Sequence, residues 1–229
     1  MVITGVSPNS LGEGLATSIA RHSPAELILA SRTKSKLDSV AQQIETLSPV
    51  KPKLVVLDLS SQAAIRKAAS EISHLVNHID ILINNAGVVT SERDETLEGI
   101  ELQFGANHVG HHLLTSLLTP RLLTASSNAS QTGVTRVVNV TSLGYVLSPV
   151  RFHDYNFEGK PVPPEEEPLA SLPAHMKPDP ANGPPYFVFT AYGQSKTANI
   201  LHAVSLNEKL GGKGVKAFAV HPGCECGQA

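Results

Sequence analysis

Short apolar runs alternate with segments of helical periodicity along the whole of this 229-residue chain. The segment 26–31 holds a continuous apolar run, and Leu37, Val40 and Ile44 after it have the spacing of one helix face. Such a run is typical of a strand covered on both faces, and a helix is the usual link between parallel strands. The alternation therefore predicts a single α/β domain over residues 1–229, with a parallel sheet and helices on both faces. The predicted strands are residues 2–3, 26–31, 54–57, 79–83, 136–140 and 215–220.

Local signals set the expected ends of the helices. Ser35 and Asp38 have the spacing of a capping box at the start of the second helix. A long helix is predicted over residues 97–119, and Pro120 is expected to end it because proline cannot donate a backbone hydrogen bond. A last helix is predicted over about residues 190–210.

One segment, residues 152–189, interrupts the alternation. It contains nine prolines, so it cannot form a long helix. Long loops within compact domains are commonly lids or disordered excursions. Because the segment lies between Ser142 and Tyr192, two candidate catalytic residues that are discussed below, we favour a lid on the substrate side, with disorder as the alternative.

Composition narrows the classes of partner. Apolar residues make up 41% of the chain, and the net charge of −2 gives no reason to expect nucleic acid or an anionic membrane. No apolar run is long enough to cross a bilayer, and the first residues do not resemble a secretory signal. Cys224 and Cys226 are too few for a disulfide framework or a metal site. We therefore expect a cytoplasmic protein that acts on small molecules.

A glycine-containing loop follows the first predicted strand and precedes the first helix. Glycine lets a pyrophosphate approach the main chain, and a helix N-terminus offers free N–H groups to its phosphates. The residues expected at this turn include Gly5 and Gly12. The order of strand, glycine turn and helix indicates a dinucleotide site, although structural turns also use glycine.

The end of the second strand indicates which dinucleotide is bound. An acidic residue there would favour NAD, whereas this chain has Arg32, followed by Lys34 and Lys36. A guanidinium suits a 2′-phosphate in charge and geometry, so we expect NADP(H). Asp58, after the third strand, is compatible with two roles: accepting a hydrogen bond from the adenine amino group, or capping the next helix.

Tyr192 and Lys196 are four residues apart in a predicted helix, so they share one face. An ammonium near a phenol favours the phenolate, which enables Tyr192 to exchange a proton with a substrate. The spacing alone is a weak signal, since a surface pair has the same pattern. It gains weight from further motifs in a fixed order: Thr4-Gly5 with Leu11-Gly12, Asn84-Asn85-Ala86-Gly87, Asn107, Ser142, Tyr192-Gly193-Gln194-Ser195-Lys196 and His221-Pro222-Gly223.

Together these motifs resemble those of the short-chain dehydrogenase/reductases, and residues 107–115 and 198–201 are most similar to the retinol-dehydrogenase-like branch. The resemblance implies a doubly wound Rossmann-type sheet of strand order 3-2-1-4-5-6, and a homodimer. It also implies hydride transfer between NADP(H) and a carbonyl or alcohol substrate. Tyr192 is then the general acid/base, Lys196 holds the nicotinamide ribose, Ser142 bonds the substrate oxygen, and Asn107 holds a helix kink and a water. The cofactor would contact Gly5, Ser7, Ser10, Leu11, Gly12, Arg32, Asp58, Leu59, Asn85, Ala86, Gly87, Tyr192, Lys196, Pro222 and Gly223.

The chain departs from the family pattern in three places. Ser10 stands where the family has a glycine, so we expect Ser7, Asn9 and Ser10 to supply phosphate donors. Tyr155 lies at the customary distance after Ser142, but position 159 is glycine, so Tyr192 keeps the catalytic role. The sequence ends soon after the sixth strand, so we expect the seventh strand to be absent. That shortening favours an alternative, a non-redox descendant that acts as a cyclase or a regulatory cofactor-binding scaffold.

His108 and His112 are four residues apart, a spacing that can bind zinc. No cysteine or carboxylate in a suitable position completes such a site. We therefore expect no metal.

Overall fold

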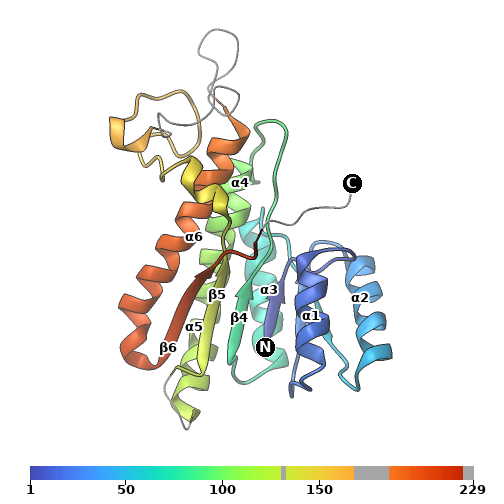
Figure 1. The fold of residues 1–229 in the computed structure, drawn as a ribbon. Helices are drawn as coiled ribbons and strands as arrows, with labels where there is room; N and C mark the ends of the chain where they lie inside the picture. Colours follow the sequence, from blue (N-terminus) through green and yellow to red (C-terminus); the bar gives the residue numbers. More distant parts are fainter. Residues whose placement is uncertain (130–132, 168–185, 224–229) are drawn as a thin grey trace.

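The fold is a six-stranded parallel sheet between two layers of helices (Figure 1). The computed structural model describes residues 1–129, 133–167 and 186–223. All neighbouring strands pair in parallel, and the predicted order 3-2-1-4-5-6 is confirmed. In that order the strands are β3 (Lys53–Val56), β2 (Ile28–Ser31), β1 (Val2–Thr4), β4 (Ile81–Asn84), β5 (Thr135–Val140) and β6 (Val215–Val220).

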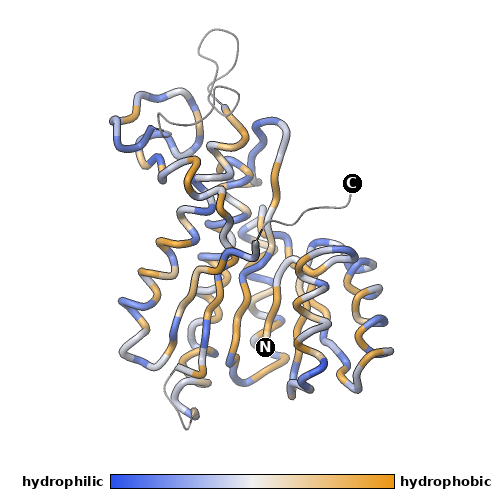
Figure 2. The backbone as a smooth tube through the Cα atoms, in the orientation of Figure 1, coloured by the Kyte–Doolittle hydropathy of each residue, from blue (hydrophilic) through white to orange (hydrophobic). Residues whose placement is uncertain are grey.

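Successive strand residues face opposite helix layers, as the pleat of a strand requires. Ile28 belongs to the apolar cluster that includes side chains of α3 (Gln62–Leu75), α5 (Gly110–Asn128) and α6 (Val188–Leu210). Its neighbour Leu29 belongs to the other cluster, with α1 (Leu11–Ala20) and α2 (Lys34–Leu47). Polar and apolar residues alternate along these helices (Figure 2). The described part of the chain has no helix that is long and apolar enough to span a membrane.

The capping box expected at Ser35 is wrong. The N-cap of α2 lies two residues earlier, at Thr33, whose side chain makes no capping hydrogen bond. Asp38 instead accepts a bond from the ammonium of Lys34 at 2.7 Å. The ion pair between exposed residues four apart uses the carboxylate that the capping box needed.

The single helix expected over residues 97–119 is also wrong. The chain there forms α4 (Leu102–Phe104), a π-helical turn η1 (Gly105–Val109) and then α5, which continues through Pro120. Proline in a helix interior costs about 3 kcal/mol, but α5 buries an apolar face that outweighs this cost. Its fully buried residues include Leu114, Leu118 and Leu122.

The first part of the proline-rich insertion packs against the domain. Phe157 is buried, and Arg151, Asp154 and Glu166 form a buried polar cluster beside it. This part follows the short helix η2 (Leu143–Leu147) and contains η3 (Pro164–Glu166). Residues 168–185 of the predicted lid lie outside the described residues, as do Cys224 and Cys226.

Helix α6 ends near the predicted residue. It stops at Leu210 and is followed by a helical turn, η5 (Gly211–Lys213). The left-handed residue that turns the chain into β6 is Gly214, with φ of 83°.

Candidate active site

A cavity of about 690 Å³ opens where the carboxyl ends of the parallel strands meet. Such a position, at the point where the strand order reverses between β1 and β4, is the usual ligand site of doubly wound sheets. Every predicted catalytic and cofactor residue lines this cavity: Gly5, Ser7, Ser10, Leu11, Gly12, Arg32, Asp58, Leu59, Asn85, Ala86, Gly87, Asn107, Ser142, Tyr192, Lys196, Pro222 and Gly223.

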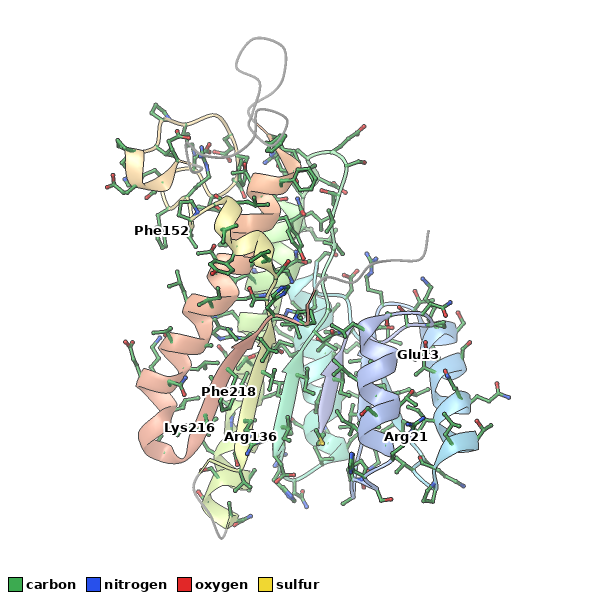
Figure 3. All side chains as sticks on the ribbon, viewed as in Figure 1. Glu13, Arg21, Arg136, Phe152, Lys216 and Phe218 are labelled. Atoms are coloured by element: carbon green, nitrogen blue, oxygen red, sulfur yellow. The ribbon has the colours of Figure 1, made fainter. Side chains whose placement is uncertain are left out.

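Close packing at the turn after β1 requires glycine at two positions. Gly5 has φ of 73°, and a Cβ there would lie 2.4 Å from the Cα of Ala86. A Cβ on Gly12 would lie 2.3 Å from the carbonyl oxygen of Gly5. The turn therefore holds the first residues of α1 against the end of the sheet. Glu13, in the first turn of α1, lies at this end of the molecule (Figure 3).

The three polar residues of this loop do not contribute equally. Ser10 is the N-cap of α1: its hydroxyl accepts from the Glu13 N–H at 3.3 Å and donates to the Ser7 carbonyl at 2.6 Å. Its one hydroxyl hydrogen is thus used within the loop. Asn9 is absent from the cavity lining, and its N–H donates to the Glu13 carboxylate at 2.7 Å. The expectation that Asn9 supplies a donor to the cavity is wrong, and Ser7 keeps that position.

Two cations line the far end of the cavity. Arg32 follows β2, and Lys36 lies in the first turn of α2. Lys34 is absent from the lining because its ammonium is paired with Asp38. The buried hydroxyl oxygen of Ser31, which also lines the cavity, makes no hydrogen bond. This end can therefore receive a ligand that carries negative charge and hydrogen-bond acceptors.

Asp58 closes the same end from the β3 side. Its Oδ1 accepts from the N–H and the hydroxyl of Ser60, at 2.9 and 2.7 Å. The N-cap of α3 is Ser61, whose hydroxyl accepts from Ala64 N–H at 3.3 Å. Asp58 therefore orders the turn before the helix, and is not the helix cap that we considered for it.

Tyr192 and Lys196 face one another at the opposite end of the cavity. The Lys196 ammonium lies 5.4 Å from the Tyr192 ring centroid and donates to the Val140 carbonyl at 3.3 Å. Burial lowers the pKa of Lys196 to about 8. The lysine is held by the end of β5, so its ammonium stays close to both the tyrosine and the cavity.

Asn107 joins the loop after β4 to the tyrosine helix. Its amide accepts from the Val88 N–H at 2.7 Å and donates to the Val88 carbonyl at 3.0 Å. It also donates to the Ser195 hydroxyl at 3.1 Å, and that hydroxyl donates to the Tyr192 carbonyl at 2.7 Å. The π-helical turn η1 provides the predicted distortion of the helix at this residue.

Ser142 caps η2 beside Tyr192. Its hydroxyl oxygen accepts from the Gly144 N–H at 3.1 Å, which leaves the hydroxyl hydrogen available to a ligand. Gly144 lies against the Tyr192 ring, since a Cβ there would be 2.9 Å from two ring atoms. The serine and the tyrosine thus approach the cavity from adjacent segments.

Sequence reasoning missed several residues of the cavity. Thr141 lies between the predicted strand 136–140 and Ser142. It anchors the tyrosine helix, because its hydroxyl donates to the Lys196 carbonyl at 2.9 Å. Its position at the end of β5 is the signal that could have identified it. The apolar residues Val88, Leu102 and Leu143 also line the cavity, but no local sequence signal distinguishes them from core residues.

His108, His112 and His202 form a cluster outside the cavity lining. The ring centroids of His112 and His202 are 5.0 Å apart, and the His108 ring meets His202 edge-on at 5.8 Å. Within residues 1–129, 133–167 and 186–223, no group of three or more potential ligands is arranged to hold a metal ion. Burial lowers the pKa of His108 to about 4 and that of His202 to about 3.

A dinucleotide suits the chemistry of this lining. The start of α1 can face a pyrophosphate, the cations Arg32 and Lys36 lie at one end, and Tyr192 and Lys196 at the other. The doubly wound sheet and this site are typical of the dinucleotide-binding proteins.

Comparison with known proteins identifies the family. The family model of the short chain dehydrogenases matches residues 1–155. An oxidoreductase from Fusarium equiseti, fscI, is 35% identical over 97% of this chain and 85% of its own length. The chain therefore belongs to the short-chain dehydrogenase family.

Retinol dehydrogenases are also similar to this chain. Retinol dehydrogenase 12 from Mus musculus and retinol dehydrogenase 11 from Homo sapiens are each 34% identical over 97% of it. The chain spans 60% of the length of each.

Solved structures share the fold. An uncharacterized protein from Mycobacterium paratuberculosis matches with a TM-score of 0.73 and 31% identity, over 98% of this chain and 68% of its own. An NADPH-bound carbonyl reductase from chicken fatty liver matches with a TM-score of 0.69 and 19% identity, over 97% and 78%.

Proposed function

We propose that this protein is an NADP(H)-dependent oxidoreductase that interconverts a carbonyl and an alcohol, with Tyr192 as the general acid/base. The observation that carries the proposal is a single cavity with Arg32 at one end and Tyr192, Lys196 and Ser142 at the other. When bound, the cofactor would supply the hydride on reduction and accept it on oxidation. The protein supplies position, electrostatics and one proton.

Each residue at the reacting end has a role that follows from its surroundings. Tyr192 donates a proton to the substrate oxygen on reduction and accepts one on oxidation. Lys196, held by Val140, places positive charge beside the phenol and favours the phenolate. Ser142 donates its remaining hydroxyl hydrogen to the same substrate oxygen. Asn107 holds the β4 loop and α6 together, so that these groups keep their relative positions.

The cofactor is held by the rest of the lining. Arg32 pairs with the 2′-phosphate of the adenosine ribose, and Asp58 faces the adenine. Asn85, Ala86 and Gly87 leave room beside the adenosine, and Pro222 and Gly223 lie at the nicotinamide end. The start of α1 and the hydroxyl of Ser7 face the pyrophosphate. Leu102 and Leu143 provide apolar surface for the substrate.

Consumption of NADPH with a panel of ketones and aldehydes, retinal included, tests the proposal. We expect oxidation of NADPH with at least one class of carbonyl, and product alcohol in equal amount. NADPH binding without turnover of any carbonyl would support the non-redox scaffold. Absence of both binding and turnover would overturn both readings.

We also propose a homodimer formed through α5 and α6. Leu201 and Val204 of α6 are 47% and 51% exposed, and both lie on the outer side of that helix. Light scattering on the purified protein should give twice the chain mass of 24.2 kDa. A monomer at micromolar concentration would contradict this part of the proposal.

A further inference from the structure

A chain of hydrogen bonds passes through the buried side chain of His111, a residue that the proposed reaction does not use. The ring is 1% exposed. Its Nδ1 lies 2.9 Å from the carbonyl oxygen of Asn107, one turn earlier. Its Nε2 lies 2.8 Å from the hydroxyl of Thr4, at the end of β1.

These partners determine which ring nitrogen carries the hydrogen. A carbonyl oxygen can only accept, so Nδ1 of His111 must be the donor to Asn107. Burial lowers the pKa of His111 to about 4, so the ring is neutral at pH 7 and Nε2 has no hydrogen. Nε2 therefore accepts, and the Thr4 hydroxyl donates to it at 2.8 Å rather than to the Ile83 carbonyl, which lies farther away at 3.4 Å.

The Thr4 hydroxyl extends this series of hydrogen bonds to the loop after β4 that contains Asn85 and Ala86, the cofactor loop. It accepts from the backbone N–H groups of Asn85 and Ala86, at 3.0 and 3.1 Å. A hydroxyl has one hydrogen to donate and two lone pairs to accept with, so this one is fully used. His111 thus connects the loop after β4, which lines the cavity, to the π-helical turn.

Asn107 lies in the middle of the π-helical turn η1. The N–H of Gly110 donates to the Gly105 carbonyl, five residues back, so the backbone bonds here differ from those of an α-helix. The Asn107 side chain then reaches Val88 and Ser195. A shift of the turn would displace the bonds of Asn107 to Val88 and to Ser195. The Ser195 hydroxyl in turn donates to the Tyr192 carbonyl.

We propose that His111 is a positioning residue of this active site. As the Nδ1–H tautomer it fixes the Asn107 carbonyl and, through Thr4, the loop at Asn85 and Ala86. The tyrosine helix and the cofactor loop thereby keep one relative position. The catalytic consequence rests on the proposed function, whereas the tautomer and the link to the cofactor loop do not.

Two substitutions separate the hydrogen bond of Nδ1 to Asn107 from the hydrogen bond of Nε2 with Thr4. An asparagine at position 111 can place its amide where Nδ1 lies, and a glutamine can place its amide where Nε2 lies. We expect His111→Asn to keep kcat within about threefold of wild type. His111→Gln and His111→Leu should lower kcat by about ten- to a hundredfold, with a smaller change in KM, because the reacting groups lose alignment.

A matched control removes a buried hydrogen bond that does not belong to the series of bonds through His111. Thr115, one turn after His111, is fully buried and accepts from Asn84 at 3.0 Å. Thr115→Val should lower thermal stability and leave kcat unchanged. If His111→Gln and His111→Asn have equal kcat, or if Thr115→Val loses as much kcat as His111→Gln, the proposal is overturned.

Imidazole nitrogen NMR provides a readout that is independent of turnover. We expect His111 to show the Nδ1–H tautomer at pH 7, and the Nε2–H tautomer would overturn the proposal. If wild type turns over no carbonyl, the proposed function fails, and the NADPH dissociation constant replaces kcat. His111→Asn, which loses the contact with Thr4 and hence with the loop at Asn85 and Ala86, should then weaken NADPH binding more than His111→Gln, and equal affinities would overturn the positioning role.

Discussion

The ammonium of Lys196 lies 5.4 Å from the centroid of the Tyr192 ring and donates to the carbonyl of Val140 at 3.3 Å. The lysine is almost completely buried, so its charge acts on the tyrosine with less screening than it would have in water. This pair forms one end of a cavity whose other end carries Arg32 and Lys36.

Tyr192→Phe should reduce turnover by at least about a hundredfold, because the phenol supplies the proton and the phenyl ring keeps only its packing. NADPH affinity should change little, since the ring and Lys196 remain. Steady-state kinetics and a cofactor titration of the same preparation check both expectations.

Tyr155→Phe is the matched control. The Tyr155 ring packs on Phe104, at 6.0 Å between centroids, and Tyr155 is absent from the cavity lining. Turnover should therefore stay at the wild-type level. If Tyr155→Phe is inactive and Tyr192→Phe is active, the proton comes from Tyr155.

Lys196→Met should raise the stability of the cofactor-free protein at pH 7 while it abolishes activity. Burial lowers the lysine pKa from 10.5 to about 8, so the native state binds the proton less tightly than the unfolded chain. The buried charge costs about 3 kcal/mol of stability, and this cost is fully present below pH 8. It disappears as pH rises to 10.5, the pKa of the lysine in the unfolded chain.

Thermal unfolding of the two proteins between pH 7 and pH 10.5 tests this sign. The advantage of the methionine variant should shrink across that range. A constant difference, or a wild type that is the more stable protein at pH 7, would show that the ammonium is not destabilising.

Sequence patterns could predict the sheet and the cavity because both depend on features that repeat. The strand order follows from right-handed crossovers between buried apolar runs, and residues such as Gly5 and Tyr192 lie where those strands end. For the motifs that come soon after a strand, such as Asn85 and Ser142, that position was enough to place them at one edge of the sheet.

Local signals failed where tertiary packing decided the outcome. Pro120 is a helix breaker in isolation, but the buried face of α5 keeps the helix continuous. The π-helical turn at Asn107 depends on partners far away in the chain, such as Val88 and Ser195. No spacing near residue 107 encodes those contacts, so the role of His111 became visible only in three dimensions.

Acid should unfold the protein through its buried histidines. Burial lowers the pKa of His108 and of His111 to about 4, and of His202 to about 3. The unfolded chain binds protons at these residues below about pH 6.5, whereas the native protein does not until about pH 4. Their contribution to the free energy of unfolding is therefore present above pH 6.5 and is lost as pH falls toward 4. The loss is about 4 kcal/mol per pH unit for the three groups together.

Urea unfolding at several pH values measures this slope. His202→Gln should reduce the slope by about one third, since one of the three groups is removed. His22→Gln, at an exposed position, is the control and should leave the slope unchanged. An unaltered slope in the His202 variant would show that this histidine titrates alike in both states.

Arg32 and Lys36 should together set the preference for NADPH over NADH. Both line the cavity, and a charge-assisted hydrogen bond to a phosphate contributes roughly 1.5–3 kcal/mol. Arg32→Ala should weaken NADPH binding about ten- to a hundredfold and leave NADH binding nearly unchanged, because only NADPH carries the 2′-phosphate. Lys36→Ala should have the same selectivity with a smaller effect, since an ammonium lacks the fork of a guanidinium.

Lys34→Ala separates a specific contact from a general effect of positive charge. Lys34 is two residues from both cations, but its ammonium pairs with Asp38 and does not line the cavity. Its removal changes the net charge by the same amount as the other substitutions, yet the ratio of NADPH to NADH affinity should stay at the wild-type value. Fluorescence titration of the four proteins with both cofactors, at one fixed salt concentration, gives the ratios. If Lys34→Ala lowers the ratio as much as Arg32→Ala, diffuse charge selects the cofactor; if wild type binds NADH and NADPH equally, neither residue does.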